Sequence, residues 1–217
     1  MDGARRWAFF SGHAAGLIPL LVAYVLLTAF RDFRDNFAAE IWLALGYKDV
    51  ATMFTASEVP VALLSLVTLG ALMLVRDNRR ALMLIHLAIA AGALVIGGAT
   101  LAFHWGLIGS APWMILAGAG LYMAYTPFNA ILFDRMIAAT REVGTAGFMI
   151  YVADACGYAG SVGLLLLRNF STIHLDWLHF FEDTGYATAA LCAVGAALSA
   201  WHFRGRSPAP RRETGPQ

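Results

Sequence analysis

Charged side chains are scarce in this sequence. Only 13% of its 217 residues are Asp, Glu, Lys or Arg, whereas soluble domains average roughly 25%. The formal net charge is +1, so the chain lacks the basic field that nucleic-acid binding requires. We therefore do not expect a nucleic-acid partner.

Cysteine and catalytic motifs are also scarce. The two cysteines, Cys156 and Cys192, each lie inside an apolar segment, which predicts small buried hydrophobic residues rather than disulfide partners or metal ligands. The sequence contains no metal-ligand spacing, no glycine-rich phosphate loop, and no Ser or Cys with a base at helical spacing. We expect no metal, no cofactor and no enzymatic activity.

Hydrophobic residues, by contrast, make up 59% of the chain and fall in long runs. A membrane-spanning helix needs about 20 mostly apolar residues. We predict an all-α polytopic membrane protein, with a six-helix transmembrane domain over residues 1–204 and a disordered cytoplasmic tail over 205–217. The six predicted spans cover residues 11–30 (or 11–45), 51–75, 81–103, 107–133, 144–167 and 184–203.

Most positive charges fall on the side of the predicted bundle that carries both termini. Of the 15 Lys and Arg residues, 11 lie on that side, 2 lie on the other (Lys48 and Arg168), and 2 lie in or near the first helix (Arg31 and Arg34). Because cytoplasmic loops carry an excess of Lys and Arg, both termini are predicted to be cytoplasmic.

Aromatic residues indicate where the membrane interfaces lie. The longest polar stretch between spans, residues 168–183, holds Trp177, Phe180 and Phe181, which predicts an outer loop lying on the interface. The other tryptophans agree with this topology: Trp7 and Trp201 at the inner interface, and Trp42, Trp105 and Trp113 at the outer one.

The most informative polar feature ends the first apolar run, where five of six residues are polar: Arg31, Asp32, Arg34, Asp35 and Asn36. Charge at membrane depth costs at least about 2.5 kcal/mol per residue. If the helix continues past Phe30, Arg31 and Asp35 can pair on one face, and the long helix tilts or kinks near Pro19. The alternative is a helix that ends at Phe30, with the cluster in an outer interfacial turn.

Two carboxylates lie in other spans. Glu58 precedes Pro60 in the second span and is either an intramembrane carboxylate or an interfacial partner of Arg31 or Arg34. Asp154 lies near the middle of the fifth span, where burial demands a partner or a proton. A proton relay and a structural hydrogen bond to a neighbouring helix are both open for it.

The fourth span contains a polar stretch around Pro127, with Tyr122, Tyr125 and Asn129. Proline frees a backbone carbonyl, which a cavity can use; the alternative is a simple kink.

In the fifth span, Ala153, Gly157 and Ser161 recur at four-residue steps, which favours close helix packing over a ligand site. His86 in the third span is interpreted as a packing histidine.

Several segments resemble one six-helix half, of the C-terminal type, of major facilitator superfamily transporters. The loop 75–80 is similar to the short basic loop between the second and third helices of each half, with Asn78 and a missing glycine as departures. Segments 31–37, 128–135 and 147–158 look like an uncharacterised bacterial group within that superfamily. The resemblance covers nearly the whole chain and implies a bacterial inner-membrane protein.

A narrower likeness concerns the run from Tyr24 to Arg31, which resembles the first helix of organophosphate/phosphate antiporters. It implies that Arg31 binds the anionic group of a small anionic or zwitterionic solute. Asp32 and Asp35 closely follow and could neutralise the site, which leaves a zwitterion or a cation as alternatives.

Together with the residue patterns, the resemblance implies secondary transport by alternating access. The expected substrate-binding residues are Arg31, Arg34, Asp35, Asn36, Tyr125 and Asn129, with Glu58 and Asp154 for proton coupling or charge pairing. A full transporter has two such halves, so the expected partner is a second copy or another six-helix chain. The alternative function is a non-transporting scaffold or an incomplete transporter fragment.

Overall fold

The computed structural model describes residues 3–140, 146–170 and 176–205. Of the predicted tail over 205–217, only Gly205 falls within these ranges. Six helical stretches are long and apolar enough to cross a membrane, and α5, η1 and α6 together form one of them. The predicted all-α polytopic fold is confirmed. The helices are α1 (Gly3–Asn36), α2 (Ala38–Ala44), α3 (Val50–Met73), α4 (Asn78–His104), α5 (Ser110–Pro127), the π-helical η1 (Phe128–Leu132), α6 (Phe133–Thr140), α7 (Ala146–Phe170) and α8 (Trp177–Arg204).

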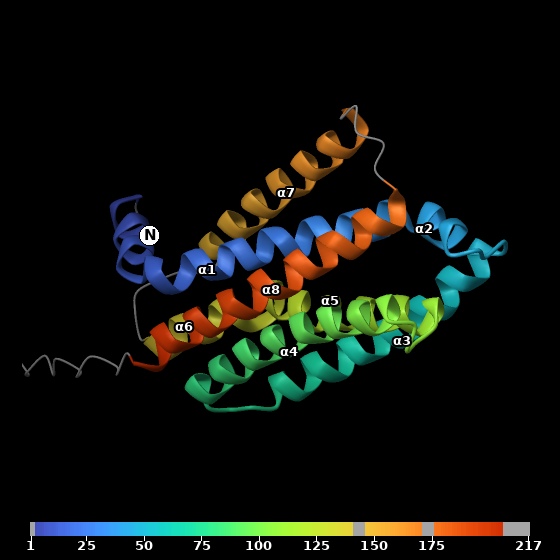
Figure 1. Cartoon of the computed structure of the whole chain (residues 1–217). Helices are drawn as coiled ribbons and strands as arrows, with labels where there is room; N and C mark the ends of the chain where they lie inside the picture. The colour runs from blue at the N-terminus through green and yellow to red at the C-terminus, as the bar shows by residue number, and fades with distance from the viewer. Residues whose placement is uncertain (1–2, 141–145, 171–175, 206–217) are drawn as a thin grey trace, which may run out of the picture.

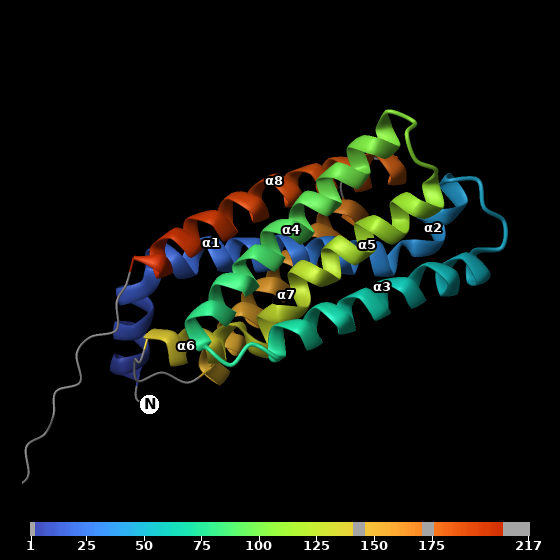
Figure 2. The same ribbon diagram turned by 90° about the horizontal axis from the view of Figure 1, so that it is seen from below.

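The spanning helices form an open arc rather than a closed ring (Figures 1 and 2). α1 packs against α7 and α8, α4 packs against α8 and α5, and α3 packs against α5. The order of main neighbours is therefore α7, α1, α8, α4, α5, α3, with α3 and α7 at its two ends. Only 17% of the most apolar window of α3 and of α7 is buried, against 61% in α1.

The first helix continues through the charged cluster, so the alternative that it ends at Phe30 is wrong. α1 reaches Asn36, and Phe37 donates its backbone N–H to the carbonyl of Phe33 at 3.0 Å, which carries the helical pattern into α2. The N-terminal part of α1 bends away from the rest (Figure 1), and Pro19 lies inside this helix.

Three helices begin with an aspartate cap. The carboxylates of Asp49, Asp77 and Asp176 each accept a hydrogen bond from a backbone N–H in the first turn of α3, α4 and α8. Such caps satisfy donors that the helix itself leaves free. Donation by the N–H groups of His179 and Leu178 lowers the pKa of Asp176 below its ordinary value.

The cap at Asp176 corrects two sequence predictions. Residues 177–183 belong to α8 and are not an interfacial loop. Phe181 is buried and stacks on Phe30 with ring centroids 4.8 Å apart. Trp42 and Trp113, predicted at the outer interface, are also fully buried core residues, because aromatic rings from several helices gather at this end.

Small residues bring neighbouring helices close. A Cβ on Gly120 of α5 would lie 2.6 Å from the carbonyl oxygen of Gly92 in α4. A Cβ on Gly157 of α7 would lie 2.9 Å from the hydroxyl of Thr28 in α1. The packing role predicted for the stripe in the fifth span therefore agrees with the structure.

The two cysteines have different surroundings. Cys192 is buried, and its thiol donates to the carbonyl of Ala23 at 3.5 Å. Cys156 is exposed on α7. The prediction that Cys156 is buried is wrong, because α7 lies at one end of the arc and is covered mainly by α1.

Candidate functional site

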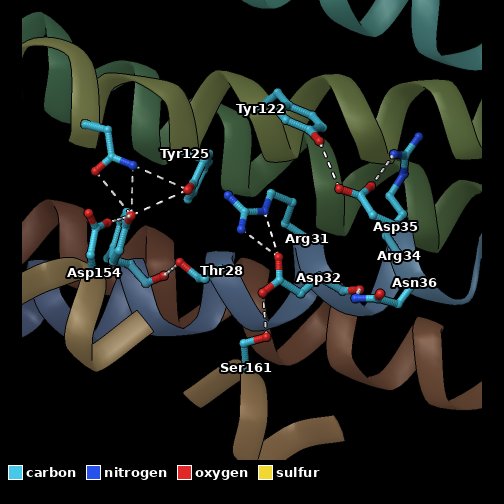
Figure 3. Close-up of polar contacts among 12 residues, drawn as sticks. Thr28, Arg31, Asp32, Arg34, Asp35, Asn36, Tyr122, Tyr125, Asp154 and Ser161 are labelled. Carbon is cyan, nitrogen blue, oxygen red and sulfur yellow. Dashed lines mark hydrogen bonds and ion pairs between the residues drawn. The ribbon is translucent and has the colours of Figure 1, made fainter. Parts of the chain in front are cut away.

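A row of polar side chains follows one face of α1. Tyr24, Thr28, Arg31 and Asp35 recur at steps of four, three and four residues, which places them on the same side of a helix. With a rise of 1.5 Å per residue, Tyr24 and Asp35 are separated by about 16 Å along the axis. Figure 3 shows this row between α5 and α7. We use the name polar track for this row together with Asp32 and Arg34 of α1 and the side chains of other helices that bond to them. Those side chains are Glu58, Tyr122, Tyr125, Asn129, Asp154 and Ser161.

One end of the track centres on the hydroxyl of Tyr24. It donates to Oδ1 of Asp154 on α7 at 2.5 Å and lies 3.4 Å from the hydroxyl of Tyr125. Asn129 in η1 donates its Nδ2 to the same hydroxyl at 2.9 Å. The structural hydrogen bond considered for Asp154 is therefore present. Together with the contacts to Tyr125 and Asn129, it joins three spanning stretches.

The middle of the track is an ion pair between neighbours on α1. Arg31 donates Nε and Nη2 to Oδ1 of Asp32 at 2.9 and 2.6 Å. Its guanidinium also lies over the ring of Tyr125, 4.5 Å from the centroid. Ser161 on α7 donates to Oδ2 of Asp32 at 2.5 Å. The predicted pairing of Arg31 with Asp35 is wrong, because the flexible arginine reaches the nearer carboxylate.

The other end of the track centres on Arg34, whose side chain is only 2% exposed. Its Nη2 donates to Oε1 of Glu58 on α3 at 2.5 Å, and its Nη1 donates to Oδ1 of Asp35 at 3.4 Å. Tyr122 on α5 donates to Oδ2 of Asp35 at 3.1 Å. Gly118 makes room for the guanidinium, since a Cβ there would lie 2.7 Å from Nη2. Of the readings open for Glu58, pairing with Arg34 is the one that the structure contains.

Not every predicted site residue joins the track. Asn36 is exposed, and among the described residues its side chain donates only to the backbone carbonyl of Asp32. Tyr24 was not among the predicted site residues, although its spacing from Arg31 places both on one helix face. Ser161 was assigned to packing alone, yet it also holds Asp32.

Formal charges along the track do not balance. Two guanidinium groups, Arg31 and Arg34, face four carboxyl groups (Asp32, Asp35, Glu58 and Asp154). Both guanidinium groups already donate to carboxylates. The track therefore has an excess of carboxyl groups, which favours a positive group, and an anion would have to compete with a carboxylate at either guanidinium group.

The open side of the arc leaves parts of the track uncovered. Asp35 and Asn129 are exposed, although both belong to spanning stretches. In the described ranges, no group of three or more His, Cys, Asp and Glu side chains is placed to hold a metal ion. The uncovered polar groups are thus the carboxylate of Asp35 and the amide of Asn129.

Six apolar helices with a polar track between them define an all-α integral membrane protein. The chain belongs to DUF5690, a family of unknown function whose model matches residues 1–206. No curated protein and no solved structure matches it.

Proposed function

We propose that this protein is one six-helix unit of a secondary transporter. It moves a small zwitterionic or cationic solute by alternating access, together with a second six-helix unit. The single observation that carries the proposal is the polar track. Four carboxyl and two guanidinium groups in an apolar bundle are costly, and such groups in spanning segments typically mark substrate or ion pathways.

The charge of the track supports a solute with a positive group. A purely anionic solute would have to displace Asp32 from Arg31, or Glu58 from Arg34, and would then meet the remaining carboxylates. A positive group can meet Asp154, which pairs with neither guanidinium group, without breaking an ion pair. The likeness to phosphate antiporters favours an anion at Arg31, and the charges of this chain weigh against it.

The partner is proposed from the open arc. α3 and α7 flank the track and are the least buried spans, and polar Asp35 and Asn129 lie uncovered between them. A second unit facing this side would enclose the track, whereas lipid tails would cover the exposed sides of these polar groups and offer them no further hydrogen bonds. The second unit is either another copy or a different six-helix chain, as in the two halves of major facilitator superfamily transporters.

A ligand screen on the purified complex tests the function. A ligand that binds only the folded state raises the thermal midpoint by mass action. The probes are glycine as a zwitterion, tetraethylammonium as a cation and glycerol 3-phosphate as an anion, each followed by uptake into proteoliposomes. We expect the zwitterion or the cation to stabilise the protein and to be taken up, and Asp154→Asn to abolish both effects.

Glu40→Gln is the matched control, because Glu40 is a carboxylate on α2 outside the track. Stabilisation by the anion alone, lost in Arg31→Gln, would contradict the solute class. No stabilisation by any probe, with a complex mass equal to a single 23.4 kDa chain, would favour the scaffold.

A further inference from the structure

A groove separate from the polar track lies between the start of α4 and the end of α8. These two helix ends meet at the end of the bundle where α1 begins (Figures 1 and 2). The groove has a volume of about 920 Å³, within the range of small-ligand sites. Arg79 donates its Nη2 to the backbone carbonyl of Arg204 at 2.7 Å, which ties the two helix ends together.

The polar end of the groove is strongly basic. Arg79, Arg80 and Arg204 line it, against a single carboxylate, Asp77. That carboxylate is already used, because it accepts the backbone N–H of Arg80 at 2.7 Å. Within the described ranges, the exposed guanidinium groups of Arg80 and Arg204 have no hydrogen-bond or ion-pair partner. Two unpaired guanidinium groups at one site suit a phosphate, which they can bind in bidentate fashion.

The rest of the groove is apolar and leads onto the outer surface of the bundle. Its wall includes Leu84 and Trp201, which are 40% and 78% exposed. The same surface continues along the helices through exposed Leu87 and Leu198. A soluble anion gains nothing from such a wall, but an acyl chain buries it. Tryptophan at the end of a spanning helix also lies at the level of lipid head groups.

We propose that this groove binds an anionic phospholipid. Its phosphate lies between Arg80 and Arg204, and its acyl chains lie along Leu84 and Trp201. Basic pockets between spanning helices are typical sites for anionic head groups. The site is independent of the transport proposal, because no residue of the groove belongs to the polar track.

Native mass spectrometry of the detergent-solubilised full chain tests the site. The probes are dioleoylphosphatidylglycerol, which is anionic, and dioleoylphosphatidylcholine, which has the same chains and no net charge. We expect the anionic lipid to bind more tightly, and Arg80→Gln with Arg204→Gln to weaken it about 30-fold, which corresponds to about 1 kcal/mol for each positive charge. Arg80→Gln alone should weaken it about fivefold and serves if the double variant is not recovered.

Arg76→Gln is the matched control, because Arg76 lies in the loop just before α4 but does not line the groove. It should leave the preference for the anionic lipid intact. Equal binding of both lipids, or an equal loss in Arg76→Gln, would overturn the site. Displacement of the lipid by millimolar inorganic phosphate would assign the groove to a soluble anion instead.

Discussion

The ion pair between Arg34 and Glu58 should dominate the stability of the half of the bundle in which α1 ends and α3 begins. It joins α1 to α3, and α3 has few other polar links to the arc: its Ser65 contacts Thr126 of α5. We expect Arg34→Met and Glu58→Gln each to destabilise the protein, and the double variant to be destabilised by clearly less than the sum of the two. The reason is that removing one partner of a buried pair leaves the other charge without compensation.

The size of the coupling follows from the geometry. Two unit charges about 4 Å apart interact by about 4 kcal/mol at an effective dielectric constant of about 20. Glu58 is 26% exposed and Asp35 still lies 3.4 Å from Arg34, so water and the second carboxylate reduce the loss. We expect a coupling free energy of about 2 kcal/mol, within the range found for residues in direct contact.

The free energy of unfolding can be measured by titrating sodium dodecyl sulfate into mixed micelles of the wild type, both single variants and the double variant. Additivity to within about 0.5 kcal/mol is what independent sites give. That result would refute the predicted coupling, because it would mean that Arg34 and Glu58 contribute to stability independently of each other.

Two further predictions concern helix ends and helix crossings. Asp176→Ala should cost about 1 kcal/mol through the lost cap. Because the folded-state pKa of Asp176 lies below its ordinary value, this stabilisation is present above the ordinary aspartate pKa and disappears as the pH falls through the lowered one. The free energies of unfolding of wild type and Asp176→Asn, plotted against pH, should therefore converge or cross only in acid. A constant difference between the two down to the lowest pH would contradict the cap. Gly120→Val should destabilise by about 1–3 kcal/mol, since its side chain meets backbone rather than a movable side chain. In Gly70→Ala, where a Cβ meets nothing within 4 Å, helix propensity should give a small gain; equal losses in both variants would exclude the crossing as the cause.

Hydropathy was enough to predict the six spans, because each apolar run is long and bounded by charged or turn-forming residues. It failed at the start of α8, where Glu182 and Asp183 lower the local hydropathy, although Asp176 is a recognisable helix cap. Spacing along α1 predicted a common face for Arg31 and Asp35. It could not tell which carboxylate the flexible Arg31 side chain would reach.

The contacts between helices could not be predicted from any local sequence pattern. Tyr24 and Asp154 are 130 residues apart in the sequence and meet only because α7 packs on α1. By contrast, Glu58 was already a candidate partner of Arg34, because so few opposite charges are available in the spans. A sequence poor in charge restricts the pairings of its charges, and it says little about its many apolar contacts.

The hydroxyl of Tyr24 carries a single hydrogen, yet it touches Asp154, Asn129 and Tyr125. That hydrogen points to Oδ1 of Asp154, the nearest acceptor at 2.5 Å, and Asn129 meets the same oxygen with its amide nitrogen at 2.9 Å. A single oxygen atom thus joins α1 to α5, η1 and α7. Any movement of the Tyr24 side chain therefore alters its contacts with all three elements at once.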